Sequence, residues 1–104
     1  MNFKGMVTNK PEIVEVETKS GNKMKKATVV CEDAQSGMSF AGTAWGERAE
    51  KLCAAVAAEQ KKVIPGNMWD FKIVLLARSW TTQDGDRRYS TEVTIDDFKN
   101  IANL

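Results

Sequence analysis

Only one stretch of this chain has the apolar spacing of a helix, and it runs from Gly46 to about Gln60. Its apolar residues recur at intervals of three and four and form one stripe: Ala49, Leu52, Cys53, Val56 and Ala57. A single amphipathic helix has to bury its stripe against other elements, and the remaining segments alternate as strands do. The pattern therefore predicts a β-protein with one helix in the middle of the chain.

The alternating segments predict three strands before the helix and two after it. The first strand is expected either to be split into Asn2–Val7 and Ile13–Thr18 or to be followed by a kinked partner, because Pro11 between these segments has no N–H to donate. The other strands are expected at 23–31, 38–45, 69–80 and 88–95. An Asp84-Gly85 turn joins the last two. The tail from Asp96 to Leu104 is expected to add a short helical turn.

This order of elements is that of a five-stranded Greek-key barrel, the oligonucleotide-binding (OB) fold, with one helix between its third and fourth strands. An unrelated α+β sandwich has a similar order and stays open at this point. The 104 residues are expected to form one domain, since that length suffices for a core of its own.

Composition excludes several classes of function. The chain has no histidine, and its two cysteines, Cys31 and Cys53, match no metal or redox spacing. We therefore expect no metal, no cofactor and no catalysis. No apolar run approaches the roughly 20 residues that span a bilayer. The N-terminus lacks a signal-peptide pattern, so the expected location is the cytoplasm.

Charge is unevenly distributed along the chain although its net value is only +1. The first thirty residues hold six Lys and three Glu, and Arg78, Arg87 and Arg88 surround the Asp84-Gly85 turn. A nearly neutral protein can still present one positive face.

Two tryptophans end rows of outward residues. Trp45 follows the small side chains of Ser39, Ala41 and Thr43, and Trp80 follows Arg78. An indole stacks on any nucleobase and a guanidinium pairs with phosphate, although strand-end packing and solvated charge are the plain alternatives. Trp69 is expected in the core or an interface. The candidate nucleic-acid contacts are Trp45, Trp80, Arg78, Arg87, Arg88, Lys26, Lys25, Lys72, Tyr89 and Lys10.

Several pieces of the chain together resemble bacterial-type single-stranded DNA-binding proteins. They are Pro11-Glu12, Ser20-Gly21, TAWGERAEKL at 43–52 and ARSWTTQDGDRRYSTEV at 77–93. The resemblance implies the same barrel and dimers or tetramers that coat exposed strands in replication, recombination and repair. It also implies that Trp45 and Trp80 stack on bases and that Arg78, Arg87 and Arg88 occupy the family's basic positions.

The chain also departs from that family. Its further stacking aromatics fall near Cys31 and Ser39 here, so those platforms are expected to be missing. The chain stops at Leu104 without a long linker and acidic tip, which puts recruitment of replication or repair enzymes through such a tip in doubt. A short, tailless member of phage or plasmid type is the expectation.

The resulting hypothesis is a non-catalytic, homo-oligomeric protein that binds single-stranded DNA with little regard to sequence. Two alternatives stay open. The barrel could serve a replication or conjugation adaptor through protein contacts, or it could bind RNA.

Overall fold

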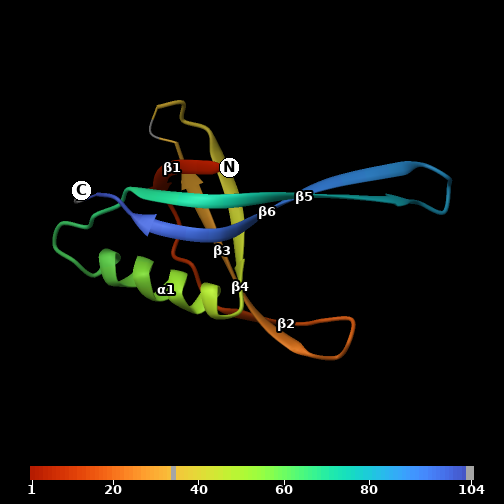
Figure 1. Cartoon of the computed structure of the whole chain (residues 1–104), viewed down its shortest axis with the longest axis horizontal. Helices are drawn as coiled ribbons and strands as arrows, with labels where there is room; N and C mark the ends of the chain where they lie inside the picture. Colours follow the sequence, from red (N-terminus) through yellow and green to blue (C-terminus); the bar gives the residue numbers. More distant parts are fainter. Residues whose placement is uncertain (34, 103–104) are drawn as a thin grey trace.

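Strands and helix follow one another as expected in the computed structural model, which describes residues 1–33 and 35–102. The elements are β1 (Asn2–Val7), β2 (Val14–Glu17), β3 (Lys23–Glu32), β4 (Ser39–Trp45), α1 (Glu47–Gln60), β5 (Trp69–Thr81) and β6 (Arg87–Asn100). The six strands form one sheet, and α1 lies across one side of it (Figure 1).

The sheet closes on itself because β1 pairs with two strands. Its order is β1-β5-β6-β4-β3-β2, and β1 also pairs with β3. β1 and β2 both pair antiparallel with β3, at its Glu32 end and its Lys23 end respectively. They are therefore the two halves of the expected split first strand. Counted in this way, the five-stranded barrel with its helix between the third and fourth strands is confirmed.

Closure depends on a glycine where β1 passes from β5 to β3. Gly5 pairs with Trp69 of β5, and Met6 pairs with Glu32 of β3. A Cβ on Gly5 would lie 2.4 Å from the backbone oxygen of Glu32. That distance is too short for any side chain, so the close approach of β1 and β3 requires glycine here.

The core fills the barrel and the space beneath α1. Trp69, Phe71 and Ile73 alternate inward from β5, and Ala49, Leu52 and Val56 come from the helix. Cys53 and Ala57, the other members of the helical stripe, are only partly buried. Trp69 stacks on Phe71 at a centroid distance of 6.3 Å, which confirms its expected core position.

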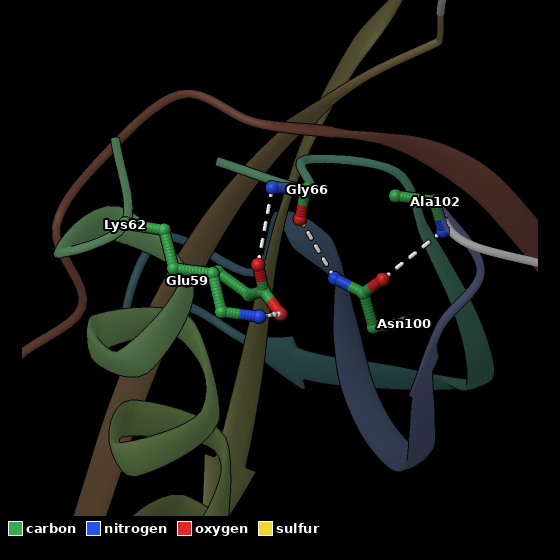
Figure 2. Close-up of polar contacts among 5 residues, drawn as sticks. All are labelled: Glu59, Lys62, Gly66, Asn100 and Ala102. Carbon is green, nitrogen blue, oxygen red and sulfur yellow. Dashed lines mark hydrogen bonds and ion pairs between the residues drawn. The ribbon is translucent and has the colours of Figure 1, made fainter. Parts of the chain in front are cut away.

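A small polar network fixes the connection from α1 to β5 (Figure 2). The Glu59 carboxylate accepts hydrogen bonds from Lys62 Nζ (2.8 Å) and from the Gly66 N–H (3.0 Å). Asn100 Nδ2 at the end of β6 donates to the Gly66 carbonyl (2.7 Å). These bonds, that from Lys62 above all, lower the pKa of Glu59. The helix end, the loop and β6 are thus tied at one point.

The last strand is longer than expected. β6 continues to Asn100 with a bulge at Asp96, and residues 97–100 pair with β5. The predicted helical turn after Asp96 is therefore wrong as far as the described residues extend, and residues 103–104 lie outside them. Pairing with Trp69–Lys72 satisfies this backbone better than a short isolated turn would.

The β5–β6 hairpin extends far beyond the barrel (Figure 1). Its paired part reaches Thr81 and Arg87, and from Val74 outward every residue of β5 is exposed. The outer part of β5 is therefore open to solvent, whereas Val93 and Thr94 of β6 stay partly buried near the barrel. Among the helices of the described residues, none is long and apolar enough to cross a membrane.

Candidate nucleic-acid interface

An open groove of about 420 Å³ runs over the outer face of the barrel between β3, β4 and the base of the β5–β6 hairpin. It contains one indole, one ammonium and one guanidinium, from Trp45, Lys26 and Arg78. The floor between them is built from small side chains, including Ala41, Thr43 and Thr94. Three predicted residues from three different strands therefore meet at one surface.

The register of the sheet explains why Lys26 and Trp45 meet. They are direct partners across β3 and β4, so both side chains point to the same side of the sheet. Lys26 Nζ lies 6.0 Å from the centroid of the Trp45 ring, within reach of a cation–π contact. Trp45 keeps 38% of its surface exposed, which leaves the indole accessible to a ligand.

The same row continues onto the β2–β3 hairpin. Val14 is the partner of Lys26 on its other side, and Val16 is the partner of Met24. Val14 and Met24 are exposed. An apolar surface thus extends from Trp45 past Lys26 along this hairpin.

Arg78 has an acidic neighbour in the groove. Its Nη2 lies 3.4 Å from Glu92 Oε2, and both side chains are largely exposed. The guanidinium keeps further donors free for a ligand, since an arginine carries five N–H groups. A phosphate that binds here would compete with the Glu92 carboxylate.

The two faces of the β5–β6 hairpin divide the predicted residues at its tip. Trp80 is the direct partner of Arg88 and lies in the same row of β5 as Arg78. Tyr89 is the partner of Ser79 and Arg87 is the partner of Thr81, so both belong to the opposite row. Trp80 and Arg88 therefore continue the face of the groove, whereas Tyr89 and Arg87 point away from it.

The structure separates three predicted lysines from this surface. Lys25 lies on the other side of β3 and forms an ion pair with Glu50 of α1, which raises its pKa. Lys72 lies near the barrel, where its Nζ is 3.8 Å from Asp96 Oδ2. Lys10 lies in the β1–β2 loop beside Asn9, whose carbonyl accepts a hydrogen bond from Gln60 at the end of α1.

The cysteines belong to the core rather than to the groove. Cys31 is fully buried, and burial raises its pKa to about 12; Cys53 is half-buried and its pKa is also raised. Within residues 1–33 and 35–102, no three His, Cys, Asp or Glu side chains gather as metal ligands would.

Several residues at this surface were not predicted from the sequence, because the pairing register of the strands places them there. Glu92 and Thr94 enter the groove because β6 pairs with β5 and, through Thr43 and Thr94, with β4. Val14 and Met24 join through the pairing of β2 with β3. The alternation of residues 88–95 marks Glu92 as a neighbour of Arg88 in one row, but it does not identify the strand beside that row.

Comparison with solved structures identifies the fold. The second OB-fold domain of replication protein A from Methanococcus maripaludis matches 96% of this chain and 81% of its own, with 18% identity and a TM-score of 0.55. The SSB domain of a Synechococcus protein matches 94% of this chain and 90% of its own, with 12% identity and a TM-score of 0.58. The chain has an OB fold. No family model matches it, and neither does any curated protein sequence.

Proposed function

We propose that this protein binds single-stranded DNA without catalysis and with little regard to sequence. In this proposal Trp45 and Trp80 stack on bases, and Lys26, Arg78 and Arg88 pair with phosphates. Stacking tolerates any base, and phosphate contacts read none, so neither element selects a sequence.

The observation that carries the proposal is the meeting of Trp45, Lys26 and Arg78 in one open groove on the outer face of an OB barrel. The Trp80–Arg88 pair extends this face along the hairpin. An exposed indole beside a guanidinium suits a flexible polyanion that carries flat rings. The names of the two similar structures, a replication protein A domain and an SSB domain, support the same substrate.

A fluorescence titration with oligo-dT tests the proposal. Two of the three tryptophans are exposed and Trp69 is buried, so DNA is expected to quench the emission of Trp45 and Trp80 only. The Trp45→Phe/Trp80→Phe double variant retains Trp69 as an internal control and is expected to show no quenching. Absence of quenching of the natural protein at low salt would refute the proposal.

Removal of one indole measures its share of the binding. Trp80→Ala and Trp45→Ala are each expected to weaken oligo-dT binding about 5- to 150-fold, since one stacked base contributes roughly 1–3 kcal/mol. The adaptor alternative predicts a different result, in which Trp80→Ala dissociates a protein complex and leaves DNA affinity unchanged. Competition between matched DNA and RNA oligomers tests the RNA alternative.

The biological role follows from the resemblance described above. We infer a homo-oligomer that coats exposed strands during replication, recombination or repair in the cytoplasm, with the whole chain acting as one domain. The family would be that of bacterial-type single-stranded DNA-binding proteins of phage or plasmid type. Five predicted residues stay outside the proposed contacts. Lys25 and Lys72 form ion pairs elsewhere, and Lys10 does not line the groove. Arg87 and Tyr89 belong to the opposite row of the hairpin.

A further inference from the structure

The loop between α1 and β5 carries the most exposed large apolar side chains among the described residues. Val63 is fully exposed and Ile64 is 86% exposed, higher fractions than that of any other large apolar residue described. Pro65, which follows them, is exposed as well. Side chains this exposed add no buried area to the core, and a contiguous apolar patch in water often marks an interaction site.

Hydrogen bonds hold this loop beside the apolar residues. Gly66 donates its N–H to the Glu59 carboxylate and accepts a hydrogen bond from Asn100 Nδ2 (Figure 2). Pro65 has a fixed φ and favours an extended conformation for the residue before it. The backbone that presents the apolar side chains is therefore restrained, so a partner that covers them pays little entropy for ordering the loop.

A small cavity of about 180 Å³ opens beside the loop. It is lined by Val56, Glu59, Gln60, Pro65, Asn67 and Trp69. Its polar side chains have partners within the protein: Gln60 Nε2 donates to the Asn9 carbonyl, and the Asn67 amide bonds both backbone groups of Val7. Small-molecule sites have roughly 300–1,000 Å³, so this cavity suits one apolar side chain of a partner.

The charged residues around the loop favour an acidic partner. Lys61 and Lys62 directly precede the apolar residues, and Lys10 adjoins the residue whose carbonyl binds the last residue of α1. Glu59 belongs to the same helix end, but Lys62 already pairs with it. Glu12 lies nearer the middle of the helix. Lys61 and Lys10 are therefore the charges that a partner's carboxylates would meet.

We propose that the loop at 61–67 and the adjoining cavity bind an acidic segment of another protein that carries one apolar anchor residue. The anchor enters the cavity, the carboxylates lie against Lys61 and Lys10, and the segment covers Val63 and Ile64. A lipid surface would cover the two side chains but leave the cavity unfilled. In Figure 1 the loop lies at the left, whereas the hairpins that border the groove project to the right, so DNA and this partner can bind together.

Selection of phage-displayed random peptides on the immobilised chain tests the inference, with and without oligo-dT, so its result is independent of DNA binding. We expect enriched peptides in which Asp or Glu flanks a large apolar residue. A labelled synthetic copy of one such peptide is then titrated by fluorescence anisotropy. Val63→Ser and Ile64→Ser are each expected to weaken its binding about 10- to 100-fold, the effect of one buried aliphatic side chain. Leu76→Ser is the matched control, since Leu76 is 46% exposed on the β5–β6 hairpin.

The charge of the loop is tested in the same titration. Lys61→Glu is expected to weaken binding of the acidic peptide about 2- to 10-fold, the loss of one exposed ion pair and its replacement by a repulsion. Lys19→Glu makes the same charge change in the turn between β2 and β3 and is expected to have little effect.

Circular dichroism of each variant distinguishes lost binding from lost folding, and Lys61→Glu decides if a serine variant unfolds. Selection that enriches no peptide, or only peptides without acidic residues, would overturn the inference. Binding that the loop variants leave unchanged, or that oligo-dT displaces, would also overturn it. The same holds if the serine variants abolish only binding to phosphatidylcholine–phosphatidylglycerol vesicles, or only self-association of the chain.

Discussion

Arg78 and Glu92 lie together in the groove, where Lys26 is the other charged residue. The pair is exposed and its closest atoms are 3.4 Å apart, so it contributes little to stability, about 1 kcal/mol or less. Its effect on a bound phosphate is expected to be larger, because the Glu92 carboxylate both pairs with the Arg78 guanidinium and repels phosphate.

Glu92→Gln is therefore expected to strengthen oligo-dT binding about 2- to 5-fold at low salt, the equivalent of one exposed ion pair. Fluorescence titration measures the change. Glu17→Gln is the control, since Glu17 pairs across the strands with Lys23 on the other side of the β2–β3 hairpin. Weaker binding by the Glu92 variant, or equal gains for both variants, would contradict this role for Glu92.

The candidate contact residues were predictable from the sequence, but the side chains that lie beside them were not. Trp45 and Trp80 stand out because alternation places each at the end of an outward row. Lys25 and Lys26 look equivalent in the sequence, yet adjacent positions on a strand face opposite sides. The pairing register then brings Lys26 to Trp45 and places Lys25 beside Glu50 of α1.

The β5–β6 hairpin is the element whose two faces differ most. Arg87 and Arg88 are neighbours in the chain, but their cross-strand partners, Thr81 and Trp80, lie on opposite faces. The sequence shows both arginines and the turn between the strands. Their assignment to faces required the position of the hairpin relative to the barrel.

Arg88→Ala is expected to reduce the slope of log affinity against log salt by about 0.7, the value for one phosphate contact on a single strand. Arg87→Ala removes the same charge from the other face and is expected to change the slope much less. Titrations of oligo-dT at several salt concentrations measure both. Equal effects of the two variants would contradict the assignment of faces.

Strand β1 closes the barrel only if Gly5 lacks a side chain. Gly5→Ala places a methyl group against the backbone oxygen of Glu32, which cannot move without shifting β3. We expect a loss of about 1–3 kcal/mol in the free energy of unfolding, measured with urea. Gly42→Ala meets the terminal methyl group of Ile95 (Cδ1, 2.6 Å) rather than backbone, and should cost less because a side-chain end can shift more readily. A larger loss at Gly42 would contradict this account of closure.

The Glu59 carboxylate at the end of α1 makes the free energy of unfolding depend on pH. The pKa of Glu59 is lowered in the folded state, so its carboxylate stabilises the fold above the ordinary pKa of 4.5. That contribution is lost as pH falls through the lower, folded-state value. Glu59→Gln is expected to unfold more easily than the natural protein at pH 7, and the difference should shrink below about pH 4. A difference that stays constant with pH would contradict the role of the charge.

The whole molecule combines a closed barrel with two projecting hairpins, β2–β3 and β5–β6 (Figure 1). The order of its elements favoured the barrel over an α+β sandwich of similar order, and the pairing of β1 with both β5 and β3 closes that barrel. The length of the last strand was not predictable, since the pairing of residues 97–100 with β5 depends on a bulge at Asp96. The molecule carries its candidate groove between the bases of the two hairpins.

In the proposed function, Trp45 and Trp80 share one outward face on which nucleotides stack. The three indole N–H signals of a ¹⁵N-labelled sample, followed while oligo-dT is added, test it in one experiment. We expect the signals of Trp45 and Trp80 to shift together with one affinity while that of Trp69 stays in place. Unmoved signals from both outer indoles, or a shift of Trp69 alone, would contradict it.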